Sequence, residues 1–381
     1  MVFLKKTYIY SIFIVYMGIF PMKNTAFVKR KHKLIVGSCF VLFLMISFSS
    51  ALNTHEFDPI SFEPYHYHTY QEMTDELHTL QMNHSDIMSL TSIGKTYEGR
   101  ELWMVKLSDN VNQEEDEPGV LFMGAHHGNE KPGYEVCLFF IQYMVEHYEN
   151  NSVPEIRNAI NTTQMYIIPM VNPDGVEADT RKNCAPNHGP FGYSKTITSY
   201  GVNLNRNYDD PWFLAYIFPV RYSLPFILPD SSFNYRGPYP FSENETKAVK
   251  NFAEAHNISI SISYHSYGEF VIYPWMHTSK QTVDEPLFRS VGENITLINH
   301  YELFVKTYHL IPRNGGTLGS SENWFYREKG TIAYTIELCT ERTPTNPQVM
   351  YNLCMTQTTV HLYLCQRAQT IESEKAAFHH S

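Results

Sequence analysis

The chain has 381 residues, 43% of them hydrophobic and 18% charged, which is enough apolar sequence to bury a large core. Its formal net charge is −10, and an acidic protein repels a phosphate backbone, so we expect neutral or cationic ligands and no nucleic-acid partner. No internal repeat, low-complexity tract or Gly/Ser linker interrupts its body, so the length allows one large α/β domain or two smaller ones.

Residues 1–51 have the order of a secretory signal. A basic cluster at residues 29–33 precedes an apolar run at residues 34–48, and small residues follow up to Ala51. The run has 15 residues, fewer than the about 18–20 that span a bilayer, so we expect a secreted, extracellular protein cleaved near Ala51. This predicts no stable membrane association after cleavage. An uncleaved membrane anchor at residues 34–48 is the alternative, and Met22 is an alternative start.

Glycosylation sites and cysteines add less about the compartment. Of the six cysteines, none has the CxxC spacing of a cysteine-bound zinc. Cys354 and Cys365 fall in one expected helix, about 16 Å apart, and cannot bridge each other, so disulfides and buried free thiols both stay open. Six Asn-x-Ser/Thr sites would make an exported protein a glycoprotein; they begin at Asn83, Asn150, Asn161, Asn244, Asn257 and Asn294.

Strand and helix patterns alternate along the chain from residue 70 onwards. This alternation predicts a single α/β domain with a mixed, mostly parallel central β-sheet flanked by helices. Ligands of such sheets bind beyond the carboxyl ends of the strands. The expected elements are a helix at 70–80, strands at 101–107 and 120–125, a helix at 134–147, a strand at 164–171, a helix from a capping box at 242–245 to about 256, strands at 258–264 and 331–338, and a helix at 347–367.

Polar residues of catalytic type recur at these strand ends. His127 and Glu130 follow one strand, His265 follows a second, and Glu337 ends a third. A hydrolytic zinc needs three protein ligands and one open position, which the first three residues could supply. An H-x-x-E pair alone is expected roughly twice by chance in this chain, and His265 alone is equally well explained as a structural histidine.

Several segments together resemble the zinc carboxypeptidases of the pancreatic A/B type, in the same order over about 300 residues. The resemblance implies a zinc carboxypeptidase catalytic domain at residues 67–370 and a tail at 371–381. Residues 52–66 would form a linker too short for an inhibitory pro-domain. The matching segments are 67–70 (YHTY), 94–100 (GKTYEGR), 124–130 (GAHHGNE), 172–175 (NPDG), 181–183 (RKN), 201–207 (GVNLNRN), 235–238 (YRGP), 240–243 (PFSE), 265–267 (HSY) and 337–338 (EL).

The resemblance also implies catalytic roles. One zinc ion per chain would be held by His127, Glu130 and His265, with water in the fourth position. Glu337 would be the general base that takes the proton of this water and passes it to the leaving amine. Arg181 would face the oxygen that gains negative charge. These roles predict a metallocarboxypeptidase, which we expect to act as a monomer.

Four further residues would contact the substrate, the C-terminus of a peptide or protein. Asn205 and Arg206 would hold its terminal carboxylate, and Tyr267 would lie beside it. Glu322 occupies the position that in this family lies at the floor of the side-chain pocket, apolar in the A type and acidic in the B type. A carboxylate there predicts a preference for C-terminal Lys or Arg, unless the side chain turns away in a shifted loop.

Three departures from the family pattern stand out. Asn203 replaces an aspartate behind the first histidine, which removes a negative neighbour of that ring. Asn129 replaces an arginine that often contacts the upstream peptide. The family's substrate-capping tyrosine is expected at Gly315, and the nearby Tyr308 would need a rearranged loop to replace it. Because such a tyrosine clamps substrate, its loss predicts weaker rather than abolished activity.

Two other functions stay open from the sequence. An amidase of the same fold, acting on cell-wall peptides or N-acyl amino acids, would also bind a carboxylate through Asn205 and Arg206. An inactive secreted binding protein would keep the fold, but its ligand residues, Glu337 and Arg181 would have no reason to be intact. Metal analysis and assays on a peptide panel separate these possibilities.

Overall fold

The computed structural model describes residues 65–183, 201–209, 234–278, 280–304 and 318–379. The expected signal segment and residues 305–317, where a capping tyrosine was sought, lie outside this set. Within these ranges, none of the helices is both long enough and apolar enough to cross a bilayer.

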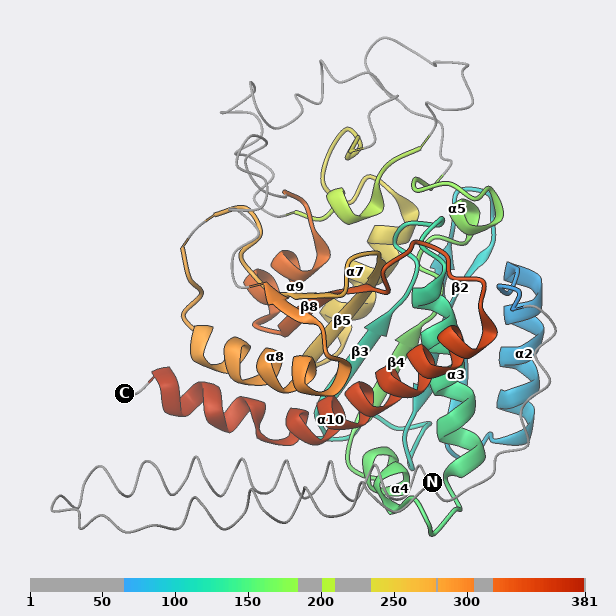
Figure 1. The fold of residues 1–381 in the computed structure, drawn as a ribbon, viewed down its shortest axis with the longest axis vertical. Helices are drawn as coiled ribbons and strands as arrows, with labels where there is room; N and C mark the ends of the chain where they lie inside the picture. Colours follow the sequence, from blue (N-terminus) through green and yellow to red (C-terminus); the bar gives the residue numbers. More distant parts are fainter. Residues whose placement is uncertain (1–64, 184–200, 210–233, 279, 305–317, 380–381) are drawn as a thin grey trace, which may run out of the picture. The chain divides into compact units, whose positions relative to one another are not determined.

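A mixed sheet of eight strands forms the centre of the described residues (Figure 1), in the order β1-β2-β4-β3-β5-β8-β6-β7. Strands β4, β3, β5 and β8 are parallel neighbours, whereas β1, β2 and β6 pair antiparallel nearer the edges. The predicted α/β fold with a mixed sheet is therefore confirmed. The strands are β1 (Met88–Lys95), β2 (Glu101–Leu107), β3 (Gly119–Met123), β4 (Gln164–Ile168), β5 (Ile258–Ser266), β6 (Phe270–Ile272), β7 (Glu302–Phe304) and β8 (Ile332–Leu338).

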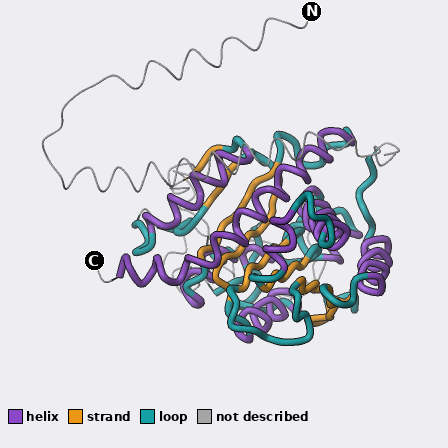
Figure 2. Tube along the Cα trace, turned by 90° about the horizontal axis from the view of Figure 1, so that it is seen from below, coloured by secondary structure: helices purple, strands orange, loops and turns teal. Residues whose placement is uncertain are grey.

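Helices lie on both faces of this sheet (Figures 1 and 2). On one face, Leu121 of β3 packs in a core cluster with Phe252 and Trp324 from two helices. On the other face, the neighbouring Phe122 contacts Phe140 and His361 from two further helices. The helices are α2 (Tyr70–Asn83), α3 (Pro132–His147), α4 (Pro154–Ile160), α5 (Pro173–Glu177), α7 (Asn244–Ala255), α8 (Glu285–Asn299), α9 (Ser321–Lys329) and α10 (Pro347–His379), with a 3-10 turn at Leu204–Arg206.

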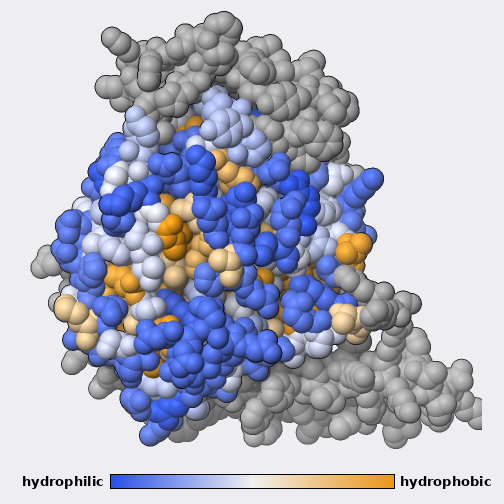
Figure 3. Space-filling model, turned by 180° about the vertical axis from the view of Figure 1, so that it is seen from behind, coloured by the Kyte–Doolittle hydropathy of each residue, from blue (hydrophilic) through white to orange (hydrophobic). Residues whose placement is uncertain are grey.

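Burial on both faces explains why the central strands are apolar almost throughout. Every residue of β3, β4 and β5 is buried. The outer surface differs: on the face seen in Figure 3, apolar side chains lie in small groups between hydrophilic ones, as expected where a surface meets water.

Two local expectations need correction. The capping box predicted at residues 242–245 does not form: α7 has Glu243 as its N-cap without a side-chain cap bond, and the Ser242 hydroxyl donates to the Glu243 carboxylate at 2.6 Å. The last helix, expected to end near residue 367, continues to His379 because apolar residues such as Ile371 keep it packed. The four cysteines in the described ranges are buried free thiols: Cys137, Cys339, Cys354 and Cys365.

Candidate metal centre

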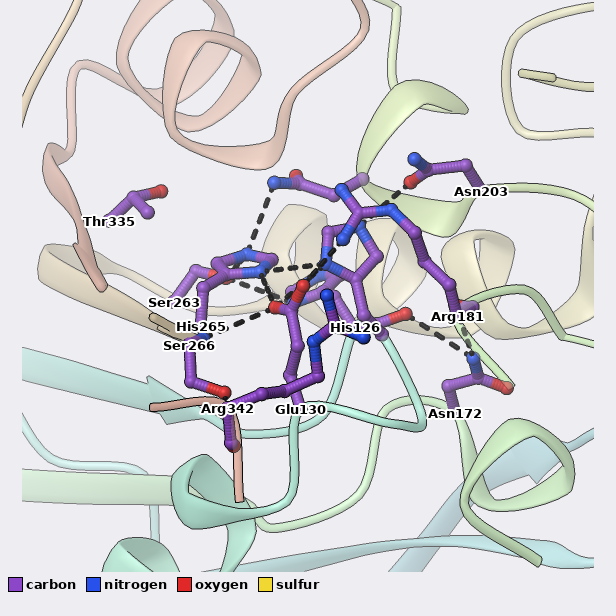
Figure 4. Close-up of polar contacts among 12 residues, drawn as sticks. His126, Glu130, Asn172, Arg181, Asn203, Ser263, His265, Ser266, Thr335 and Arg342 are labelled. Atoms are coloured by element: carbon purple, nitrogen blue, oxygen red, sulfur yellow. Dashed lines mark hydrogen bonds and ion pairs between the residues drawn. The ribbon is translucent and has the colours of Figure 1, made fainter. Parts of the chain in front are cut away.

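Three ligand-type side chains converge at the carboxyl ends of β3 and β5. His127 and Glu130 lie on the loop after β3, and His265 lies near the end of β5 (Figure 4 labels the last two). The Glu130 Oε2 atom is 2.9 Å from Nδ1 of each histidine, and the two Nδ1 atoms are 3.0 Å apart. Ligand atoms about 2.0–2.2 Å from one zinc ion lie roughly 3 Å apart, so the trio fits a single zinc ion.

Close backbone packing fixes the ligand loop. A Cβ atom at Gly128 would lie 2.0 Å from the backbone carbon of Gly175, so only glycine lets this loop touch the start of α5. Ala125, just before the loop, has a left-handed backbone with φ of 50°. The chain therefore turns sharply off β3 and brings His127 and Glu130 back over the strand ends.

The protonation states of His127 and Glu130 suit a metal. Burial lowers the pKa of His127 to about 3, and the charge of Arg181 adds to this effect, so the ring is neutral. Burial alone would raise the pKa of the Glu130 carboxyl, but His127 and His265 hold it well below its usual range. Neutral imidazoles and an ionised carboxylate are the forms that bind zinc.

Each member of the trio has an outer partner. Asn203 Oδ1 lies 2.9 Å from His127 Nε2, which places the amide behind the first histidine as the sequence indicated. Arg181 Nη1 donates to the second oxygen of Glu130 at 2.5 Å (Figure 4). Such partners orient the ring and the carboxylate whose other atoms face the metal position.

Glu337 lies across from His265. The two residues are directly opposite in the register of β5 and β8. Its carboxylate is half-buried and has no hydrogen-bond or ion-pair partner among the described residues. Burial raises the pKa of Glu337 to about 7, with the charge of Glu130 adding to the rise and His265 opposing it. A carboxyl group with this pKa can exchange a proton near neutral pH.

Comparison with known proteins decides the family. The family model described as zinc carboxypeptidase matches residues 73–363. The chain belongs to the zinc carboxypeptidase family. A zinc carboxypeptidase of Saccharothrix mutabilis subsp. capreolus is 35% identical over 287 residues, 71% of this chain and 62% of the relative. Carboxypeptidase A6 of Homo sapiens is 28% identical over 287 residues, 71% of this chain and 60% of the relative. The chain thus spans about 60% of the length of these two relatives.

Solved structures agree on the zinc carboxypeptidase fold. Bovine thrombin-activatable fibrinolysis inhibitor, solved with a tick carboxypeptidase inhibitor, gives a TM-score of 0.64 at 20% identity, over 80% of this chain and 97% of that chain. Carboxypeptidase A of Helicoverpa armigera gives 0.66 at 18% identity, over 86% of this chain and 80% of that chain.

The family's predicted carboxylate-binding pair lies next to the trio. Burial lowers the pKa of Arg206 to about 10, with the charge of Arg181 adding to the lowering, which leaves the guanidinium charged at neutral pH. The Asn205 amide is engaged within the protein: its oxygen accepts from Ser321 N at 2.8 Å, and its nitrogen lies 3.1 Å from His265 Nε2. The Asn205 side chain therefore links His265 to the start of α9.

The other two predicted substrate residues differ in exposure. Tyr267, after β5, is 54% exposed. Glu322, in the first turn of α9, is 1% exposed. One Glu322 oxygen accepts from the Thr335 hydroxyl at 3.1 Å, and the other is buried without a hydrogen-bond partner. A buried carboxylate oxygen without a donor favours a cationic ligand.

Several segments that match the family are joined to one another, and to the loop that carries His127 and Glu130, by hydrogen bonds. Asp174 accepts hydrogen bonds from the Thr96 hydroxyl, the Glu98 backbone and Arg100, which ties the GKTYEGR segment to the NPDG segment. Asn172 caps α5 and donates to the His126 carbonyl at 3.3 Å, next to the ligand loop. These segments support the loop that carries His127 and Glu130 without contacting the metal position. The side-chain type of Asp174 or Asn172 alone therefore does not predict this supporting role.

Proposed function

We propose that the chain is a zinc-dependent metallocarboxypeptidase that hydrolyses the C-terminal peptide bond of peptides and proteins. The observation that carries this proposal is the buried trio of His127, Glu130 and His265, whose ligand atoms fit one ion, with the unpaired Glu337 carboxylate beside it. Membership of the zinc carboxypeptidase family supports the same reaction.

The residues around the trio suit each part of the hydrolysis. Zinc held there would polarise the scissile carbonyl and acidify a water molecule. Glu337 would accept the proton of the attacking water and return it to the leaving amine. Arg181 would donate to the oxygen that becomes negative. Arg206 would pair with the terminal carboxylate of the substrate, which limits the reaction to chain ends.

Glu337→Gln tests the proposed chemistry. The amide cannot accept the proton of water, so we expect kcat to fall by about 10²–10⁴-fold, while one zinc per chain is retained. The measurements are metal content by mass spectrometry and release of C-terminal amino acids from a peptide panel. A parent protein that holds no zinc, or a variant that keeps full activity, would contradict the proposal.

We propose further that the enzyme prefers C-terminal Lys or Arg. Glu322 supports this preference, because its buried oxygen lacks a donor that a cationic side chain would supply. Its charge also influences the pKa of Arg206, which indicates that Glu322 lies near the proposed carboxylate site. An amidase would instead favour acylated amino acids or cell-wall peptides.

Peptides that differ only in their last residue test this preference. The parent is expected to release Lys faster than Phe or Glu, and Glu322→Gln is expected to reduce kcat/KM for Lys by at least about 10-fold, since one buried charge pair is lost. Thr335→Val, which removes only the hydroxyl bonded to Glu322, is the control. Fastest release of Phe by the parent would overturn the preference.

We also propose that the protein is secreted after cleavage near Ala51. Support comes from the basic and apolar order of residues 1–51 and from the six glycosylation-site asparagines, all of which are exposed or half-buried. Expression of the full chain in a secreting cell is expected to yield a glycosylated protein in the medium that begins close to residue 52. N-terminal sequencing checks this, and a membrane-bound product that retains residues 34–48 would contradict it.

A further inference from the structure

A row of buried polar side chains, formed by Ser263, His126 and Tyr208, extends from the His265 ring; Figure 4 labels the first two. The Ser263 hydroxyl oxygen lies 3.0 Å from His265 Nε2 and 3.0 Å from His126 Nδ1. On the far side of its ring, His126 Nε2 lies 2.9 Å from the Tyr208 hydroxyl. The four residues are at most 1% exposed. Buried polar groups of this kind are normally hydrogen-bonded within the protein.

The acceptor for the His265 ring is Ser263. His265 presents Nδ1 to the metal position, so its Nε2 carries the hydrogen in a neutral ligand ring. The nearby Asn205 amide does not accept this hydrogen, because it turns its nitrogen, a donor, to the ring and its oxygen to Ser321 N. Ser263 Oγ is the remaining contact of Nε2.

One arrangement of the remaining hydrogens is continuous along the row. In it, Ser263 accepts from His265 and donates its own hydroxyl hydrogen to His126 Nδ1, 3.0 Å away. His126 then carries its hydrogen on Nε2 and donates it to the Tyr208 oxygen, 2.9 Å away. Each bond runs in the same direction away from the metal position, and aligned hydrogen bonds of this kind strengthen one another.

We propose that Ser263, His126 and Tyr208 are positioning residues that orient His265 and raise its basicity as a zinc ligand. The inference rests on the proposed zinc site. It also gives a role to the sharp turn at Ala125: His126 points into the row, while the next residue, His127, faces the metal position. The second ring thus contacts a three-residue row, whereas the Nε2 atom of the first ring contacts Asn203 among the described residues.

Ser263→Ala tests the row, because it removes the acceptor of the His265 hydrogen. Zinc affinity of the metal-stripped full chain, measured by competition with a chromogenic chelator, is expected to fall by about 10–100-fold. Ser263→Thr keeps the hydroxyl and should restore affinity to within about 3-fold of the parent. The matched control is Ser259→Ala, since Ser259 lies on the same face of β5 with a buried hydroxyl that has no partner.

Two further measurements separate positioning from simple packing. Long-range proton–nitrogen NMR of the zinc-bound protein is expected to show the hydrogen of both His265 and His126 on Nε2. Tyr208→Phe, which ends the row one step earlier, should weaken zinc binding less than Ser263→Ala. If Ser263→Ala does not fold, zinc affinity is compared between His126→Phe and His126→Gln. The Gln variant keeps an acceptor for Ser263 and should bind zinc more tightly than the Phe variant.

Each outcome bears on one proposal only. A parent that binds no zinc would overturn the proposed function. A parent that binds zinc while Ser263→Ala binds it as tightly as Ser259→Ala would overturn the positioning row alone. An NMR result that places the His126 hydrogen on Nδ1 would also overturn the positioning row alone.

Discussion

The outer partner of His127 is an amide: Asn203 Oδ1 lies 2.9 Å from the ring Nε2. The amide oxygen can accept the ring hydrogen, but it carries no full charge to make the ring a stronger ligand. Both histidines of the trio therefore have neutral partners at Nε2 among the described residues. Arg181 is the one charged outer partner that the described residues give the trio, and it contacts Glu130.

Asn203→Asp is expected to tighten zinc binding by about 10-fold, because a carboxylate at the same place adds negative charge behind His127. Asn203→Ala removes the acceptor and should weaken zinc binding. Both are measured by chelator competition on the metal-stripped protein. Weaker binding by Asn203→Asp than by Asn203→Ala would show that charge behind this ring does not govern affinity.

Sequence reasoning at this scale found the residues that end strands. His127, Glu130, His265 and Glu337 all follow or end a strand, and the structure brings them together. The row behind His265 was not identified, although one signal was present: Ser263 is two residues before His265 and so shares its face of the strand. The contribution of Tyr208 had no local signal, because it comes from a distant loop.

One element of the fold carries a pH-sensitive group. His361 of α10 is fully buried, with its ring centroid 4.1 Å from that of Phe122 and 4.3 Å from that of Phe140. Its Nε2 lies 2.6 Å from the Tyr264 hydroxyl oxygen. Burial lowers the pKa of His361 to about 3. The contact between α10 and the sheet is therefore made by a neutral ring.

Acid should loosen this contact. The unfolded chain binds a proton at His361 below about pH 6.5, whereas the folded chain does not until about pH 3, so stability falls as pH drops through this window. His361→Gln, which keeps a polar partner for Tyr264, should lose less free energy of unfolding than the parent between pH 7 and 5, by about 2 kcal/mol. Denaturant titrations at both pH values measure this. Equal losses would contradict the assignment.

Elements were predictable where burial imposed a clear pattern. Strand β2 matches its expected bounds, and β3, β4 and β5 are apolar enough to be recognised. Strand β1 was not predicted, because its sequence MSLTSIGK is half polar and only its first residue is buried. Strands β6 and β7 have three residues each, too few for a periodic pattern, and are defined by pairing with neighbours.

At the scale of the whole molecule, the residues that the structure describes form one compact unit around the sheet. The alternating strands and helices were sufficient to predict a single α/β domain. The sheet order was not predictable from local sequence, since β4 lies between β2 and β3 and β8 lies between β5 and β6. Such order depends on which faces can be covered by helices, a property of the complete chain.

The parallel pairing of β3 with β5 has a consequence for assembly. His127 and Glu130 are three residues apart and stay near each other in an unfolded chain, but His265 is 135 residues beyond Glu130. Only the ladder that joins Val120 to Ile260 brings the third ligand to the first two. The unfolded chain should therefore bind zinc weakly, because closing the long loop between Glu130 and His265 costs conformational entropy. Tight zinc binding during folding would then indicate that β3 and β5 have already paired.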